Sequence, residues 1–247
     1  MVTDLLQIGN KIDICSLDKD DIRRAENGKV PILASQLEAV EDNGELIIQM
    51  PVYKGKIILL SLGSRYELIF YTRKGLYRGV CQVTDRYKED NLFMVKVMLK
   101  SGLNKFQRRE YFRLECILGM QAYELTREDA LRLDGASLEQ HLKDPQIIMT
   151  ESSSVIVDIS GGGIRFIGEK KYEEGDCLAV RTALQNENIN QQLLVVVSIV
   201  TCRKAAPNME RYETRAEFLH LGSKLRETII KYIFDEDRKI RKKDMGV

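Results

Sequence analysis

Short runs of β-branched and aromatic residues, separated by turn residues, constrain the fold of this chain more than any other feature. In the first hundred residues the turns are marked at Asn43-Gly44, Gly55, Gly63 and Gly75. Val, Ile and Tyr suit a pleated, half-buried surface, and Gly and Asn adopt the backbone angles of tight turns. Short strands at this spacing are typical of a small barrel or sandwich. The expected strands are residues 11–15, 45–50, 56–61, 66–71, 77–84 and 92–99.

The same pattern resumes in the second half of the chain. Its turns are marked by three consecutive glycines, Gly161 to Gly163, and by Gly175. The number of runs fits a second β-barrel of roughly a hundred residues. The expected strands are residues 111–123, 155–159, 164–167, 177–182, 193–202 and 214–219.

One segment interrupts the second set of strands. Residues 126–150 contain two patterns that resemble capping boxes, Thr126 with Asp129 and Ser137 with Gln140. In such a box the side chains at a helix start satisfy backbone N–H groups that have no partner within the helix. The sequence therefore predicts one or two short helices inserted in the second barrel.

The segment that begins at Ser223 has a different periodicity. Leu225, Ile229, Ile233 and Ile240 recur near helical spacing, which predicts an amphipathic helix that leaves the second barrel. The expected fold class is therefore mainly β: two small β-barrels joined by a short linker, with a C-terminal amphipathic helix and a short helical insert in the second barrel.

The charge balance limits the kinds of ligand this chain can bind. Its 247 residues carry 38 Lys and Arg against 37 Asp and Glu, a net charge of +1. A protein that coats nucleic acid without sequence preference has a clear basic excess. Any binding of anions must therefore come from a local cluster of basic residues.

No segment of the sequence predicts a membrane span or a disulfide framework. The longest mostly apolar run, residues 192–201, is far shorter than the roughly 20 residues of a membrane helix. The first residues lack a basic stretch followed by an apolar one, so no secretory signal is expected. The five cysteines are scattered and never in C-x-x-C spacing, which is typical of reduced thiols. We expect a cytoplasmic protein that is not an integral membrane protein.

Few residues are available for catalysis. The two histidines are His141, in the polar insert, and His220, just before the final helix. Dyads, triads and metal sites that depend on histidine have little to build on. We therefore expect no enzyme, no catalytic residues, no metal site and no cofactor.

Three arginines gather in the stretch KFQRREYFRLEC, at Arg108, Arg109 and Arg113. A guanidinium presents its donors in a rigid fork that matches phosphate oxygens and the O6/N7 edge of guanine. The alternative is a solvated basic stretch that pairs with Glu110 and Glu115, and for this pattern by itself that alternative is the more common.

A second stretch, SSSVIVDISGGGIRFIG, also carries binding chemistry. The Asp158 carboxylate accepts two hydrogen bonds side by side, which suits the N1–H and N2–H₂ donors of guanine. The Ser160 hydroxyl suits a phosphate or a base, and Gly161, Gly162 and Gly163 let backbone N–H groups approach an anion. The alternative is an ordinary hairpin, since tight turns also require glycine.

Taken together, the two stretches resemble the PilZ domain. R-x-x-x-R is followed about forty-five residues later by D-x-S-x-x-G, and the matching residues are Arg109, Arg113, Asp158, Ser160 and Gly163. The run PVYKGKIILLSLGSRYELIFYTRKGLYRGVCQV, closing with QRREYFRL, resembles the YcgR-type flagellar brake proteins, and the tail LRETIIKYIFDEDRKIRKK is similar to the helix that ends that family. The likeness extends from about residue 8 to residue 243.

The resemblance implies a division into domains. Residues 1–100 are expected to form a YcgR-like N-terminal β-barrel, residues 101–113 an interdomain linker that carries the arginines, and residues 106–247 a PilZ domain with its C-terminal helix. Residues 126–150 depart from the family pattern, because the core of the family turns more briefly there. The departure leaves both motifs intact and concerns the surface beside the site.

The resemblance also implies a ligand, cyclic di-GMP. Arg109 and Arg113 would hold phosphate and the Hoogsteen edge of guanine, while Asp158, Ser160 and the three glycines would hold the other guanine and the ring. Arg108 makes a tandem arginine, which in this family is associated with two stacked ligands per site. The linker would be mobile without ligand and ordered with it, so that ligand fixes one barrel against the other.

The expected output is regulation of motility through a flagellar motor protein, either the stator or the switch, with no nucleic-acid partner. Two alternatives from other classes stay open. One is a β-barrel that binds single-stranded nucleic acid, which would also use arginines and aromatic residues. The other is an adaptor that acts without any ligand.

Overall fold

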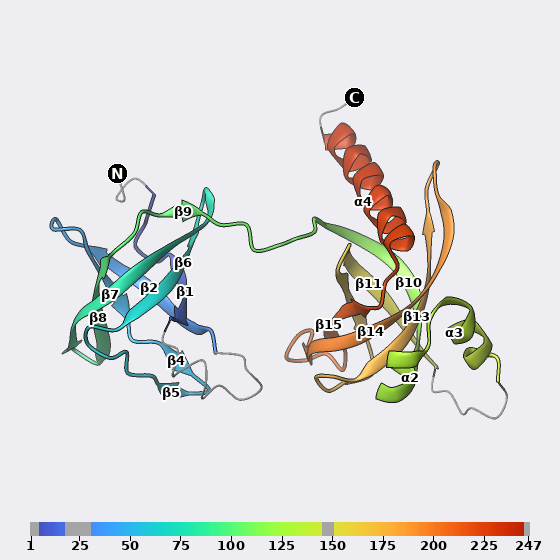
Figure 1. Ribbon diagram of the computed structural model, residues 1–247, viewed down its shortest axis with the longest axis horizontal. Coiled ribbons are helices and arrows are strands. Elements are labelled where there is room, and N and C mark those ends of the chain that lie inside the picture. Colours follow the sequence, from blue (N-terminus) through green and yellow to red (C-terminus); the bar gives the residue numbers. More distant parts are fainter. Residues whose placement is uncertain (1–4, 18–30, 145–150, 245–247) are drawn as a thin grey trace. The chain divides into compact units, whose positions relative to one another are not determined.

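The computed structural model describes residues 5–17, 31–144 and 151–244 and divides the chain into two compact units, Met1–Arg108 and Arg109–Val247. Each unit is built on a closed six-stranded antiparallel β-barrel (Figure 1). The predicted fold class, mainly β with two small barrels, a helical insert and a C-terminal helix, is confirmed.

The first unit closes through pairing of its first two strands. The barrel order is β1-β6-β7-β8-β3-β2, and β1 pairs again with β2, so that Ile14 lies opposite Leu33. Inward-facing apolar side chains alternate with exposed ones along the strands, as a barrel wall requires. The six strands are β1 (Lys11–Ser16), β2 (Leu33–Val40), β3 (Glu45–Gln49), β6 (Arg65–Thr72), β7 (Gly75–Glu89) and β8 (Leu92–Leu99).

Two features of the first unit differ from the sequence prediction. Strand β2 was not predicted; its buried residues Leu33 and Leu37 are four apart, a spacing that fits a helix as well as a strand. Residues 56–61 were predicted as one strand, but only β5 (Lys56–Ile57) forms, in a hairpin with β4 (Val52–Tyr53). The chain then leaves the ladder so that the Leu60 side chain can be buried in the core.

The second unit is a barrel of six longer strands. Its order is β10-β11-β12-β15-β14-β13, closed by pairing of β10 with β13. Helix α4 (Ser223–Asp244) confirms the predicted C-terminal helix and packs on the barrel core through Ile229, Tyr232 and Ile233. The six strands are β10 (Arg113–Leu125), β11 (Glu151–Ser160), β12 (Gly163–Gly168), β13 (Cys177–Gln185), β14 (Asn190–Lys204) and β15 (Tyr212–Leu219).

The insert forms two short helices, α2 (Arg127–Arg132) and α3 (Gly135–Leu142). The predicted cap at Thr126 is confirmed, because its hydroxyl accepts a hydrogen bond from the Asp129 N–H. The predicted cap at Ser137 is wrong: Ser137 lies in the first turn of α3, and its hydroxyl accepts a hydrogen bond from the N–H of the actual N-cap, Asp134. The insert residues 145–150 lie outside the described residues.

The predicted linker, residues 101–113, is divided between the two units. Strand β9 (Asn104–Lys105) pairs with β7, and the Phe106 N–H donates to the Leu76 carbonyl at 2.8 Å. The Ser101 hydroxyl accepts from the Val80 N–H at 2.8 Å. Residues 101–106 are therefore held on the first barrel by backbone hydrogen bonds, while residue 113 already belongs to β10 of the second.

Candidate ligand-binding site

The turn between β11 and β12 contains the three glycines and is closed by Ser160. The Ser160 hydroxyl donates to the Gly163 carbonyl at 3.2 Å and accepts from the Gly162 N–H at 3.3 Å. None of the three glycines has a left-handed φ, so the turn does not need them for backbone conformation. The reason for glycine at these three positions must therefore be that neighbouring atoms leave no room for a side chain.

That space is filled by other parts of the same unit. A Cβ at Gly163 would lie 2.2 Å from the Ala216 carbonyl oxygen on β15. A Cβ at Gly161 would lie 2.5 Å from the ring of Tyr111, and one at Gly162 would lie 3.3 Å from the same ring. The glycines thus allow β15 to approach on one side and the tyrosine of the arginine motif on the other.

Tyr111 is held on the turn by an arginine of helix α4. The Arg226 Nη1 donates to the Tyr111 hydroxyl at 3.1 Å and to the Gly161 carbonyl at 2.9 Å. The guanidinium carbon also lies 5.3 Å from the centroid of the tyrosine ring, within the range of a cation–π contact. Sequence reasoning missed both residues: Tyr111 was inside the motif, but Arg226 is 115 residues further on and carries no local signal.

The next residue of the motif contacts the same helix. The rings of Phe112 and Phe234 are stacked, with centroids 6.4 Å apart and planes inclined by 16°. Both side chains are about half exposed. The segment between Arg109 and Arg113 is therefore attached to α4 at two points, Tyr111 and Phe112.

Asp158 lies on β11 and is paired with an arginine of the neighbouring strand. The Arg165 Nε donates to Asp158 Oδ2 at 3.4 Å, and its Nη1 donates to Glu213 at 3.0 Å. Glu213 also accepts from Arg203 at 3.1 Å. The Asp158 side chain is only 13% exposed, so the arginine partly compensates for the removal of this carboxylate from water.

These charges shift the pKa values of neighbouring groups. Burial acts to lower the pKa of Arg165, but the hydrogen bond that Arg165 donates to Glu213 and the charges of Asp158 and Glu213 outweigh it, so the pKa is raised. Burial, assisted by the negative charge of Asp158, raises the pKa of the Cys116 thiol to about 12. Cys116 is therefore a protonated thiol at neutral pH and not a nucleophile.

The predicted arginines are distributed over both units. Arg113 begins β10 and lies opposite Ser160 in the β10–β11 ladder, with an exposed side chain. Arg109 is exposed and is the first residue of the second unit. Arg108 belongs to the first unit, where its Nη1 contacts Asp13 Oδ2 at 3.1 Å and the Tyr71 hydroxyl at 2.9 Å.

The structure thus brings Arg113, Asp158, Ser160 and the three glycines to one end of the β10–β11–β12 ladder in the second unit. Arg108 is placed beside Asp13 and Tyr71 in the first unit.

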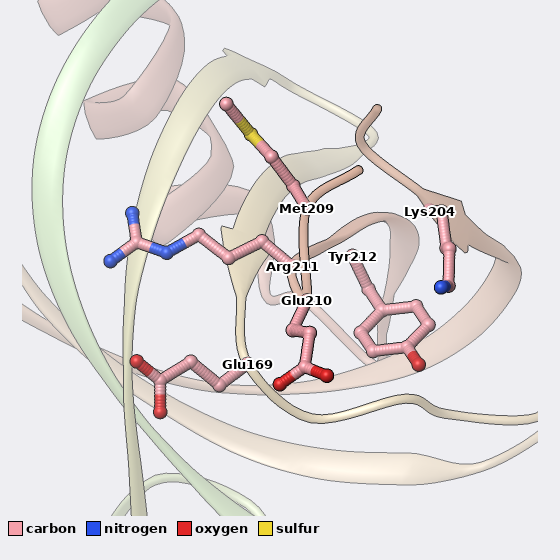
Figure 2. A pocket seen from close by; sticks show the side chains of 6 residues that line it. All are labelled: Glu169, Lys204, Met209, Glu210, Arg211 and Tyr212. Atoms are coloured by element: carbon pink, nitrogen blue, oxygen red, sulfur yellow. The ribbon is translucent and has the colours of Figure 1, made fainter. Parts of the chain in front are cut away.

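A hollow in the surface of the second unit lies away from these residues. It has a volume of about 830 Å³ and is lined by the six side chains of Figure 2, which include Glu169 and Tyr212. Gly168 pairs with Tyr212 and Gly163 pairs with Glu217, so this hollow is at the opposite end of the β12–β15 ladder from the glycine turn. None of the predicted site residues lines it.

Within residues 5–17, 31–144 and 151–244, no group of three or more His, Cys, Asp or Glu is arranged to hold a metal ion. Over the same part of the chain, none of the helices combines the length and the apolar composition needed to cross a membrane.

Comparison with known proteins identifies the family of each unit. The family model described as "Flagellar protein YcgR" matches residues 7–99, and the model described as "PilZ domain" matches residues 107–235. No curated protein sequence matches the chain.

Similar folds occur among solved structures. The Bacillus subtilis inhibitor of motility MotI/DgrA superimposes with a TM-score of 0.70 at 16% sequence identity, covering 95% of this chain and 99% of that one. YcgR from Escherichia coli in complex with c-di-GMP gives a TM-score of 0.47 at 12% identity, covering 96% and 88%. The K. pneumonia MrkH–c-di-GMP complex gives 0.39 at 14% identity, covering 95% and 90%.

The two family models together match most of the chain, and the PilZ match begins at residue 107, immediately before the arginines. The motif residues that pointed to this family, from Arg109 to Gly163, lie in the second unit, and the YcgR match covers the barrel of the first. The chain belongs to the PilZ domain family, with an amino-terminal domain of the flagellar protein YcgR type.

Proposed function

We propose that this protein is an effector that binds cyclic di-GMP at the glycine turn of its PilZ domain and regulates motility. The observation that carries the proposal is the pairing of Arg113 with Ser160 across the β10–β11 ladder. It brings the two halves of the family motif, far apart in sequence, to the same end of one barrel. Membership of the PilZ family supports the identity of the ligand.

The residues at this end match the chemistry of a cyclic dinucleotide. Arg109 and Arg113 would donate to phosphate oxygens and to the O6/N7 edge of guanine. Asp158 would accept from the Watson–Crick edge of the other guanine. Hydrogen bonds to charged groups contribute about 1.5–3 kcal/mol each. Three or four of them, less the cost of ordering the motif, would give a free energy of about −8 kcal/mol, or micromolar affinity.

The proposal includes a change in the arrangement of the two units. The boundary between the units falls inside the tandem arginine, between Arg108 and Arg109. A ligand held by Arg109 would present phosphate near Arg108, where it would compete with Asp13 for the guanidinium. Ligand binding would then change the preferred conformation of the segment that joins the two units. A flagellar motor protein, either the stator or the switch, would recognise the ligand-bound conformation.

The test is a calorimetric titration of the full chain with cyclic di-GMP. We expect micromolar binding, which Arg113→Ala abolishes and Asp158→Ala weakens at least tenfold, because each removes a charged partner of the ligand. Arg211→Ala is the matched control, since Arg211 lines the hollow at the far end of the β12–β15 ladder. It should bind like the parent, and linear GMP should bind much more weakly.

The proposal fails if Arg113→Ala, folded by circular dichroism, binds cyclic di-GMP like the parent. A parent that binds a single-stranded oligonucleotide but not cyclic di-GMP would favour a nucleic-acid-binding barrel. A parent that binds neither would favour an adaptor that acts without ligand.

A further inference from the structure

Arg226 is a half-buried guanidinium that faces neutral oxygens only. Its hydrogen bonds go from Nη1 to the Tyr111 hydroxyl and the Gly161 carbonyl. Two other partly buried arginines of the second unit are paired with carboxylates: Arg165 with Asp158 and Glu213, and Arg181 with Glu139. In the described part of the chain no carboxylate lies within ion-pairing distance of Arg226, so its positive charge is not neutralised by a partner.

This charge lies at the proposed ligand site. Gly161, whose carbonyl accepts from Arg226, directly follows Ser160, and Ser160 lies opposite Arg113 in the ladder. The glycine turn therefore has Arg113 on its β10 side and Arg226 on its α4 side. A charge that is partly removed from water without a counter-ion is unfavourable, and an anionic ligand would relieve that cost.

We infer that Arg226 is a further ligand-contacting residue of the PilZ site, which donates to a phosphate of cyclic di-GMP. The inference rests on the proposed function. In the structure, the guanidinium lies against Tyr111 and Gly161, and one of its nitrogens donates both hydrogen bonds. On binding, Arg226 exchanges these neutral acceptors for charged ones, which makes the first turns of α4 part of the site.

Calorimetry with cyclic di-GMP on three variants of the full chain tests this role. Arg226→Gln should weaken binding roughly tenfold or more, because a charge-assisted hydrogen bond is lost, and Arg226→Lys should lie between it and the parent. Lys224→Gln is the matched control: it removes the same charge from the same end of α4, where Lys224 is exposed. It should change the dissociation constant less than about twofold, as a screened surface charge does.

Two further readouts separate contact with the ligand from a structural role. The dependence of the binding constant on salt should be shallower for Arg226→Gln than for the parent, because one fewer charge pairs with phosphate. Tyr111→Phe removes the hydroxyl that holds Arg226 but keeps both the ring and the guanidinium. It should bind within about threefold of the parent if Arg226 acts on the ligand itself, since only a neutral hydrogen bond is lost.

The outcomes distinguish this inference from the proposed function. If the parent binds and Arg113→Ala does not, but Arg226→Gln matches the parent in affinity and salt dependence, the inference is wrong and the proposed function stands. If Tyr111→Phe weakens binding as much as Arg226→Gln, Arg226 only positions Tyr111 and the inference is also wrong. If the parent does not bind, both are wrong.

A measurement on the parent protein covers the case in which Arg226→Gln does not fold. Phenylglyoxal modifies accessible arginines, and mass spectrometry quantifies each site. Cyclic di-GMP should protect Arg226 together with Arg113 and leave Arg211 unprotected. Modification of Arg226 at the same rate with and without ligand overturns the inference.

Discussion

At the scale of single residues, one carbonyl oxygen explains why residue 163 is glycine. A Cβ there would lie 2.2 Å from the Ala216 oxygen, which belongs to the backbone of β15 and cannot move without disturbing the ladder. Overpacking of this kind costs about 1–3 kcal/mol. Gly163→Ala should therefore lower the free energy of unfolding of the second unit by about that amount in urea denaturation followed by circular dichroism.

Gly119 provides the control for this prediction. It also lies in a barrel strand, but a Cβ there would meet nothing within 4 Å. Gly119→Ala should leave the unfolding midpoint unchanged or raise it slightly, because alanine has less conformational freedom in the unfolded chain. Equal effects of the two substitutions would show that space at the turn is not what requires glycine at position 163.

Some residues of the candidate site could be identified from the sequence and others could not. Asp158, Ser160 and Gly163 follow one another within one motif, and this motif predicted a common site only together with the arginines Arg109 and Arg113. Arg226 could not be found in this way, because its contact with Tyr111 joins residues 115 apart and depends on how α4 crosses the barrel. The sequence also did not show why glycine is needed in the turn, since only the fold places Tyr111 against Gly161 and Gly162 and β15 against Gly163.

At the scale of elements, the insert proves to be part of the second unit's packing and not a loose addition. Leu138 of α3 is fully buried with Ala130 and Leu133, against strand residues that include Ala179 of β13. The ion pair between Arg181 and Glu139, 3.1 Å long, attaches α3 to β13 as well. The two helices thus have a small core of their own, but the expectation that they extend the surface beside the site is wrong: they follow Leu125, at the end of β10 opposite to Arg113 and the glycine turn.

Burial of this kind predicts a measurable contribution to stability. Leu138→Ala should reduce the free energy of unfolding by about 2–5 kcal/mol, the cost of a cavity in a packed core. Amide exchange of β13 and β14 measures the effect within the second unit. The control is Leu131→Ala in α2, whose side chain is 60% exposed and which should change exchange little. If the amides of β13 and β14 exchange in Leu138→Ala as they do in Leu131→Ala and the parent, the insert unfolds independently of the barrel.

Sequence patterns predicted the elements well where local chemistry determines them. The cap at Thr126 depends on a residue three positions away, and it was found. The cap of α3 was placed three residues too late, because Ser137 suits a cap and a first-turn position equally well. Strand β2 was missed because its apolar spacing suits two structures, and only closure of the barrel with β1 decides between them.

At the scale of the whole molecule, the connection between the units is much shorter than the predicted linker. Residues 104–106 are already tied to β7 by backbone hydrogen bonds, and Arg108 contacts Asp13 and Tyr71. Tyr111 and Phe112 are attached to the second unit through α4. Any change in the arrangement of the units must therefore concentrate on the few residues from 107 to 110.

This narrow connection predicts where ligand should change the dynamics of the chain. Cyclic di-GMP should slow amide exchange in residues 107–112, because the arginines of this segment become ordered on the ligand. Exchange in residues 104–106 should be slow with or without ligand, since their hydrogen bonds to β7 exist already. Arg109→Ala should remove the ligand effect, while Arg211→Ala should preserve it. Equal slowing across residues 101–113 would mean that the whole segment detaches from the first barrel before ligand binds. No slowing at all, despite tight binding, would mean that the protein signals through the surface of the bound ligand and not through the connection.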